Sequence, residues 1–329
     1  LDRLGRRSLH ATMVLFKIAY HTSPLPGAPV VEVLHDLNLA APLGDQVQAL
    51  HEAMQKSSAF KEAKAPPLGH WSNYTLQVAE TQMYLDADAD DETLGDAFAA
   101  VGTPVSATPG QDRPLLRLRP FPSFEAWERI AELDAKADVA KAKAAAFRLR
   151  YELEHTEFAE AFIGAGGLHH LLAIVVAHEG NVQAYALTAL KTAMGYCSGL
   201  EEFLSNPTLI QRLFLLVSNA VVSTVCRQAI ELLFVICNFH GWAGVYQAAR
   251  EAADDQGAQP FEACVRLLES GDADVQCNAL TFLNSMIDNA PTPAAAEELV
   301  VRFERLQLSA VLKRQTTKDS NPVFRTQVV

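Results

Sequence analysis

The chain has 329 residues, of which 49% are apolar and 20% are charged, and its formal net charge is −12. This length favours two domains that can each bury a hydrophobic core, and the apolar fraction excludes a mainly disordered chain. With 27 Lys and Arg against 39 Asp and Glu, no basic stripe is available to follow phosphates. We therefore expect no nucleic-acid partner.

The apolar runs and the cysteines indicate the compartment. The longest apolar runs, 168–177 and 213–225, are shorter or more interrupted than the roughly 20 residues of a membrane-spanning helix, so no stable membrane insertion is expected. The run 13–18 is too short for a secretion signal, and residues 1–12 are expected to be a disordered leader. Five cysteines without a CxxC pair argue against a disulfide framework. We expect a cytoplasmic protein with reduced thiols.

Residues 13–121 alternate between strand and helix patterns. In chain order they predict strands at 14–20 and 30–34, a helix at 44–54, strands at 74–79 and 83–85, a helix at 92–100 and a strand at 114–119. The order β-β-α-β-β-α-β is that of a ubiquitin-like β-grasp domain, in which the second strand lies at a sheet edge. The segments 56–69 and 102–113, rich in Pro, Ala and Gly, are predicted to be loop insertions.

Residues 122–329 have helical spacing, beginning with predicted helices at 124–133, 137–151 and 157–162. Three later helices superimpose at offsets of 43 and 50 residues through their apolar positions: Ala186, Leu187, Leu190 and Met194; Ala229, Ile230, Leu233 and Cys237; Ala279, Leu280, Leu283 and Ile287. Periods of about 40–47 residues are typical of armadillo and HEAT arrays. The predicted fold class is α+β, with a ubiquitin-like β-grasp domain at 13–121 followed by an all-α armadillo-repeat solenoid at 122–329.

Motifs that would carry chemistry are incomplete. Asp86, Asp88 and Asp90 resemble the start of a calcium loop, but Asp91 and Ala97 stand where that loop needs its glycine and its bidentate glutamate. The chain has no HExxH, no GxSxG and no phosphate-binding loop. We expect no catalytic residues, no metal and no cofactor, and hence a binding protein rather than an enzyme.

Several strings resemble a known family. They include VLFKIAY and APLGDQVQALHEAM in the first region, GGLHHLLAIV, QAIELLFVICNF and GAQPFEACVRLLE in the second, and RTQVV at the close. Together they resemble the N-terminal regulatory region of formins, and are most similar to the FHOD-type branch. In that region a GTPase-binding domain precedes an armadillo-like diaphanous inhibitory domain. The ELMO scaffolds of engulfment and cell motility share this domain order and are the nearest alternative.

The resemblance implies autoinhibition. In that family the concave face of the helical array binds an acidic, amphipathic helix from the C-terminal tail of the same protein, and actin is assembled by domains outside this chain. Carried over by position, the groove would include Lys191, Gly195, Glu231, Val235 and Asn238. Glu231, Val235 and Asn238 are spaced to share one helical face. Family members often have a basic residue where Glu231 stands.

The resemblance also implies a Rho/Rac- or Ras-family small GTPase as partner of the first domain. In such domains the edge of the second strand and nearby basic residues contact the GTPase, which suggests Lys17, His35 and Lys56 as the contacts here. The expected location is the cytoplasm and the actin cytoskeleton. The alternative function is an ELMO-like scaffold that couples a small GTPase to a Rac guanine-exchange partner. Sequence downstream of Val329 separates the two, because a polyproline stretch followed by a long helical domain indicates a formin.

Overall fold

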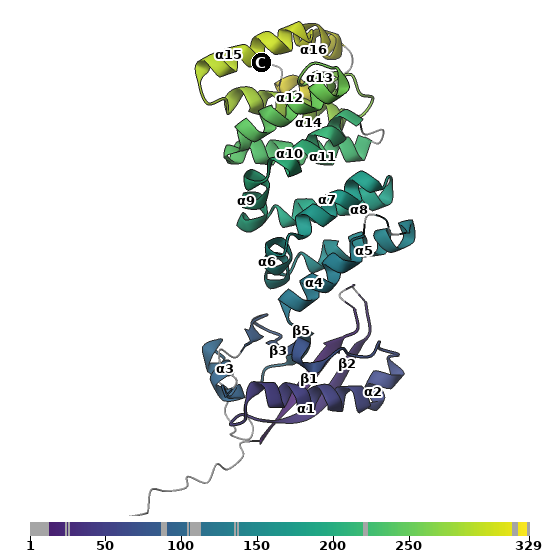
Figure 1. The fold of residues 1–329 in the computed structure, drawn as a ribbon, viewed down its shortest axis with the longest axis vertical. Helices are drawn as coiled ribbons and strands as arrows, with labels where there is room; N and C mark the ends of the chain where they lie inside the picture. Colours follow the sequence, from purple (N-terminus) through teal and green to yellow (C-terminus); the bar gives the residue numbers. More distant parts are fainter. Residues whose placement is uncertain are drawn as a thin grey trace, which may run out of the picture. The chain divides into compact units, whose positions relative to one another are not determined.

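The computed structural model describes residues 13–23, 25, 27–86, 91–103, 105, 113–134, 136, 138–219, 223–317 and 322–327. The expected leader, 1–12, and most of the predicted loop at 102–113 lie outside these residues. The chain divides into two compact units, Leu1–Glu125 and Ala126–Val329 (Figure 1). That division falls inside helix α4 (Pro122–Glu132), a few residues after the boundary near 122 that the sequence predicts.

The first unit is built on a five-stranded mixed sheet. Its strands are β1 (Met13–His21), β2 (Val30–Asn38), β3 (Tyr74–Val78), β4 (Tyr84–Leu85) and β5 (Leu116–Pro120). The strand order is β2-β1-β5-β3-β4, so β2 is an edge strand, as predicted. β1 and β5 are parallel, and every other neighbouring pair is antiparallel.

Alternation along β1 explains how this sheet acquires a core. Val14, Phe16 and Ile18 are fully buried, whereas the residues between them face outward. The buried row joins apolar side chains of helices α1 (Leu43–Lys56) and α3 (Leu94–Ala100) in one cluster. Within it Phe16 stacks on Phe98, with ring centroids 5.6 Å apart.

Two elements of this unit differ from the sequence prediction. β2 continues to Asn38, because its pairing with β1 extends over all nine residues. The predicted loop 56–69 contains a short helix, α2 (Ser58–Glu62), so that part of the prediction is wrong. The hydroxyl of Ser57 accepts a hydrogen bond from the Phe60 amide and caps this helix, and the Phe60 side chain is buried.

In the second unit, the described residues form helices joined by turns and short loops, with no strand among them. After α4 come α5 (Val139–Glu152), α6 (Thr156–Gly164), α7 (Gly167–Ala177), α8 (Asn181–Ala193), α9 (Cys197–Ser205), α10 (Pro207–Asn219), α11 (Ser223–Ile236), the π-helical turn η2 (Cys237–Gly241), α12 (Trp242–Gln256), α13 (Glu262–Leu267), α14 (Ala273–Asp288), α15 (Pro293–Arg305), α16 (Leu308–Thr317) and α17 (Pro322–Gln327). The predicted helical array is therefore present, and additional helices separate the ones that the repeat analysis aligned.

These helices form three-helix repeats: α6 to α8, α9 to α11, and α12 to α14. In each repeat the second and third helices pack together, and the third helices of successive repeats lie side by side (Figure 1). Three helices for each period of 40 to 50 residues is the arrangement expected of an armadillo-type solenoid. Leu187, Ile230 and Leu280, which the offsets aligned, are all buried in its continuous core.

A local break separates α11 from α12. Phe239 and His240 have non-helical backbone angles, and His240 lies in the left-handed region at φ +67°. The run Ser223–Gln256 is apolar and long enough to cross a membrane by length and composition alone. Most of its large apolar side chains instead pack within the core of the unit, as expected for a core helix.

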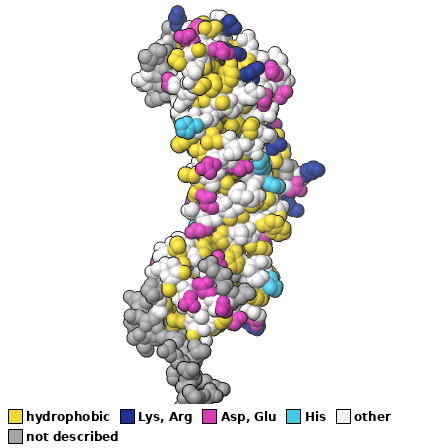
Figure 2. All heavy atoms as spheres, turned by 60° about the vertical axis from the view of Figure 1, so that its left-hand side comes forward, with side chains coloured by type: hydrophobic (Ala, Val, Ile, Leu, Met, Phe, Trp, Pro, Cys, Tyr) yellow, Lys and Arg dark blue, Asp and Glu magenta, His cyan; other side chains and the backbone are white. Residues whose placement is uncertain are grey.

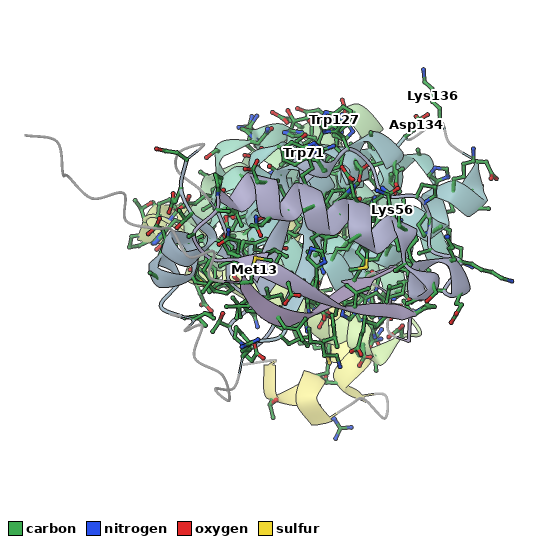
Figure 3. All side chains as sticks on the ribbon, turned by 90° about the horizontal axis from the view of Figure 1, so that it is seen from below. Met13, Lys56, Trp71, Trp127, Asp134 and Lys136 are labelled. Carbon is green, nitrogen blue, oxygen red and sulfur yellow. The ribbon has the colours of Figure 1, made fainter. Side chains whose placement is uncertain are left out.

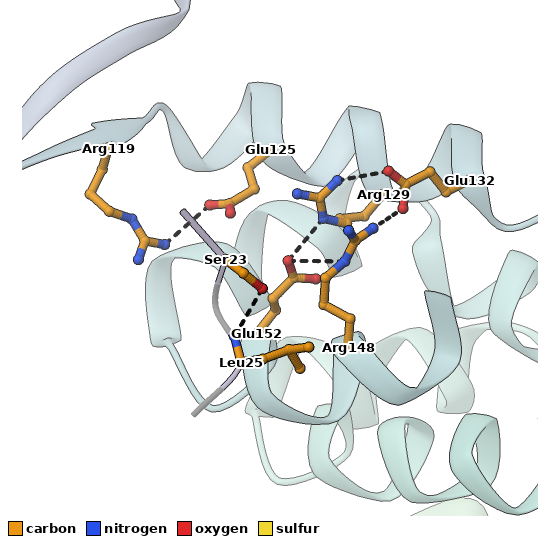
Figure 4. A network of polar contacts seen from close by, with 8 residues as sticks. All are labelled: Ser23, Leu25, Arg119, Glu125, Arg129, Glu132, Arg148 and Glu152. Carbon is orange, nitrogen blue, oxygen red and sulfur yellow. Dashed lines mark hydrogen bonds and ion pairs between the residues drawn. The ribbon is translucent and has the colours of Figure 1, made fainter. Parts of the chain in front are cut away.

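Ion pairs connect the first two helices of the second unit (Figure 4). The Glu152 side chain is almost fully buried, and its carboxylate accepts from Arg129 Nε at 2.8 Å and lies 3.6 Å from Arg148 Nε. Glu132 pairs with both arginines. Because a buried charge without a partner is costly, this network holds α4 against α5.

Candidate functional site

The third helices of successive repeats carry polar side chains that bond across the repeats. Between α8 and α11 the bonded residues are 40 apart, as in Thr188 with Gln228 and Lys191 with Glu231. Between α11 and α14 they are 47 apart, as in Glu231 with Asn278. Both values are three residues less than the offsets of 43 and 50 that align the helices. Neighbouring third helices are therefore shifted by just under one turn.

A first hollow of about 430 Å³ opens on this surface between α8, α11 and α14. Its charged lining consists of Lys191, Arg227, Glu231 and Asp274. Lys191 Nζ lies 2.7 Å from Glu231 Oε2, and Arg227 Nη1 lies 2.9 Å from Asp274 Oδ2. Asn278 donates to the other oxygen of Glu231 at 3.0 Å. Each cation is thus already paired with a carboxylate of the next helix.

A second hollow of about 280 Å³ lies further along α11 and α14. Asn238 Nδ2 donates to the Phe234 carbonyl at 2.8 Å and to Ser285 Oγ at 3.0 Å, and Asn238 Oδ1 accepts from Asn289 at 3.3 Å. Asp288 completes one rim. We call the surface that contains both hollows the α11–α14 seam. Its lining is mainly polar side chains that hydrogen bonds hold in place.

The structure brings some of the five predicted groove residues together on the seam. Lys191 and Glu231 are bonded to each other in the first hollow, and Asn238 lines the second. Val235 is half-buried and packs against the core, and it lines neither hollow. Gly195 is exposed in the turn after α8. The predicted set therefore contains polar seam residues, one packing residue and one turn residue.

Several seam residues were not predicted from the sequence. They lie mostly on α14 and include Asn278, Asn284, Ser285, Asp288 and Asn289. The repeat offset is the signal that leads to them: shifting the α11 positions by about 47 residues reaches Asn278 from Glu231 and Ser285 from Asn238.

The charged side chains of the seam include one more acid than base. The first hollow has two basic and two acidic side chains, and the second has one carboxylate, that of Asp288. On the face drawn in Figure 2, Lys and Arg side chains stand singly or in small groups and form no continuous stripe.

Burial, followed by the nearby Asp274 carboxylate, raises the pKa of the Cys277 thiol at the edge of the first hollow. A raised pKa makes this thiol a poor nucleophile.

Within the part of the chain that the structure describes, no group of three or more His, Cys, Asp or Glu side chains could hold a metal ion. A further hollow of about 460 Å³ lies at the α4–α5 connection and is lined by Asp134, Asp138, Lys141 and Arg148 among others. Figure 3 shows Asp134 and Lys136 at this connection. None of the predicted site residues lines it.

The three residues predicted to contact a GTPase do not form one patch. Lys17 lies on the outer face of β1, where it pairs with Glu32 at 2.8 Å. His35 pairs with the buried Phe16 across the two strands, so its side chain is on the same face of the sheet as Phe16 and on the opposite face from Lys17. Burial lowers the pKa of His35, and the Asp36 carboxylate opposes that effect. Lys56 is at the end of α1, bonded to Glu52 (Figure 3). Only Lys17 and His35 border the β2 edge region.

Comparison with known proteins relates the helical unit to a named domain family. A model described as the FHOD1/3 FH3 domain matches residues 180–311, which include the whole α11–α14 seam. Formin-C of Dictyostelium discoideum is 44% identical over 183 residues, covering 55% of this chain and 16% of that protein. Human FH1/FH2 domain-containing protein 1 is 23% identical over 300 residues, covering 89% of this chain and 24% of that protein.

A solved structure also has a similar fold. The crystal structure of E. histolytica Formin1 bound to EhRho1-GTPγS matches with a TM-score of 0.52 and 12% identity, over 63% of this chain and 73% of that one. The sequence matches confirm the resemblance to the N-terminal regulatory region of formins. The chain spans between 16% and 24% of the length of the two curated relatives named above.

Proposed function

We propose that this chain, which resembles the N-terminal regulatory region of formins, is the regulatory part of an actin-assembling formin. Its helical unit would bind the C-terminal tail of the same protein and keep actin assembly inactive, and its sheet unit would bind a small GTPase. The observation that carries the proposal is the α11–α14 seam. It lies within the matched FH3 region and contains Lys191, Glu231 and Asn238.

Tail binding is supported by the chemistry of the seam. Two adjacent hollows along one helix pair suit a helical segment that presents side chains at successive turns. Lys191 and Arg227 can pair with acidic residues of such a segment, and the amides around Asn238 and Asn289 can hydrogen-bond its polar groups. Phe239, which is 54% exposed and follows Asn238, offers an apolar contact beside them.

GTPase binding is supported by the sheet unit. We infer that this unit is a ubiquitin-like β-grasp domain, because the strand order β2-β1-β5-β3-β4 with parallel β1 and β5 is the order expected of that fold. The similar E. histolytica formin is described as bound to a Rho protein. A partner that approaches the β2 edge would meet Lys17 on one face and His35 on the other, which explains how both could contribute.

The proposed setting is the cytoplasm and the actin cytoskeleton. The chain spans a minor part of its relatives, so actin would be contacted by segments outside it. Its own role would be regulatory: it would bind and release partners without catalysis and without a cofactor.

A binding experiment tests this function. An acidic peptide from the C-terminal tail of the full-length protein is expected to bind the chain with low-micromolar or tighter affinity in fluorescence anisotropy. Val235→Asp is expected to abolish binding. Val235 lies one turn after Glu231 on α11, so a carboxylate there would add negative charge next to the first hollow and repel an acidic segment.

The matched control is Leu312→Asp, another half-buried apolar residue packed against the same core but on α16. Circular dichroism checks that both variants fold. Unchanged affinity in Val235→Asp would remove Val235 from the groove. Absence of binding to the unmodified chain would reject tail recognition itself.

A further inference from the structure

In the first hollow, two carboxylates of the chain itself lie where the carboxylates of an acidic ligand would bind, next to Lys191 and Arg227. Glu231 Oε2 lies 2.7 Å from Lys191 Nζ, at the distance of a strong charge-assisted hydrogen bond. Asp274 is placed in the same way on Arg227, at 2.9 Å. A carboxylate of a bound peptide can reach either cation only by displacing or sharing with the residue already there.

Glu231 is the more firmly held of the two acids. Its side chain is 31% exposed, against 67% for Asp274, and its second oxygen accepts a hydrogen bond from Asn278 at 3.0 Å. It therefore remains against Lys191, whose own side chain is 58% exposed and accessible to a ligand. The ammonium group of Lys191 is accessible to solvent, while Glu231 already accepts one of its hydrogen bonds and offsets its charge.

We propose that Glu231 is an internal competitor for acidic ligands of the seam: it occupies Lys191 and so weakens the binding of an acidic segment. This inference rests on the proposed function and adds a specificity-determining residue to it. Exposed ion pairs contribute little to stability, so the pair can exchange for a ligand carboxylate at small cost. The consequence is a tail interaction that is weaker, and more easily released, than the same groove would give without Glu231.

The test is a double-mutant cycle with Glu231→Gln, Lys191→Gln and the double variant, using the acidic C-terminal tail peptide. Glu231→Gln keeps the hydrogen bond to Asn278 possible but removes the charge. It is expected to tighten peptide binding by about 1.5- to 5-fold, the range that a single exposed charge pair allows. The gain should vanish when Lys191 is also replaced. Weaker or unchanged binding by Glu231→Gln would overturn the proposal.

A control separates local competition from general charge. Glu269→Gln removes an equal charge from a half-exposed acid that pairs with Arg314 elsewhere on the same unit. It should leave the affinity unchanged. An equal gain in this variant, or a gain by Glu231→Gln that survives replacement of Lys191, would show a long-range effect and reject the competitor role.

A second probe keeps the inference testable if the tail peptide does not bind at all. Hexaglutamate, followed by NMR titration, reports whether Lys191 is available to any carboxylate. Glu231→Gln should bind it more tightly than the unmodified chain, and the added Lys191→Gln change should reverse this. No difference between these proteins would reject internal competition, whereas failure of the tail peptide alone would reject only the proposed function.

Discussion

At the scale of single residues, Gly199 shows how closely the repeats are packed. A Cβ atom at this position would lie 2.1 Å from the carbonyl oxygen of Ala193, which ends α8. Gly199 lies in the first turn of α9, so the chain can reverse here only because no side chain intervenes. The tight turn that contains Gly195 depends on this contact.

Gly199→Ala is expected to lower the free energy of unfolding by about 1–3 kcal/mol, the usual cost of overpacking. Urea unfolding of the helical unit measures it. The control is Gly164→Ala in α6, where a new Cβ would meet no atom within 4 Å, and a change between zero and a gain of about 1 kcal/mol is expected. Equal effects of the two changes would show that the close contact is unimportant.

The hydrogen bonds and ion pairs of the seam could not be predicted from the sequence. The resemblance named both Lys191 and Glu231, but nothing in the sequence indicates that they bond to each other, because they are 40 residues apart. Asn278 was not named at all, although it holds the second oxygen of Glu231. Such contacts depend on the shift between stacked helices, which local patterns do not contain.

At the scale of elements, β2 is the exposed feature of the sheet unit. It is nine residues long and lies at the edge of the sheet, and Leu34 on its outer face is 69% exposed. Leu34 lies opposite Lys17. A long edge strand with an exposed apolar residue is a candidate for binding another protein.

Leu34→Asp is expected to weaken binding of a GTPγS-loaded Rho-family GTPase by at least about 10-fold, since a desolvated apolar contact becomes a charge. Its exposure means that folding should be unaffected. Met83→Asp, 45% exposed beside β4 at the opposite edge, is the matched control and should bind normally. Isothermal titration calorimetry makes the comparison. Loss in both variants, or in neither, would argue against the β2 edge.

Element positions were largely predictable. The strands β1 and β3 and the helix α1 follow their predicted ranges closely, because alternation and helical periodicity are local signals. α2 was missed because its five residues are too few to show a period, and its burial depends on Phe60 meeting the core of the sheet unit. Short helices of this kind are decided by tertiary contacts.

At the scale of the whole molecule, the two units have separate hydrophobic cores. A ligand that binds one native unit stabilises that unit by mass action. Tryptophan can report them separately, because Trp71 belongs to the sheet unit, whereas Trp127 and Trp242 belong to the helical unit. Trp71 and Trp127 are labelled in Figure 3. Tail binding should therefore be visible in one unfolding transition and not in the other.

The acidic tail peptide at 100 times its Kd is expected to stabilise the helical unit by about 2.7 kcal/mol and to leave the sheet unit unchanged. Variants that retain only Trp71 or only Trp242 follow the two transitions by fluorescence during heating. A shift of the Trp71 transition, or no shift of the Trp242 transition at saturation, would contradict binding to the seam.

The sequence alone determined the two-part organisation, the positions of most strands and helices, the repeat period and the resemblance to formin regulatory regions, because each of these is recorded in local spacing or in matching strings. Only the tertiary structure decided which of those helices bond to one another, that Lys191 is occupied by Glu231, and that Lys17 and His35 face opposite sides of the sheet. The physical reason is that periodicity fixes which face of an element is apolar, whereas the shift between stacked helices is set by how all their side chains pack together.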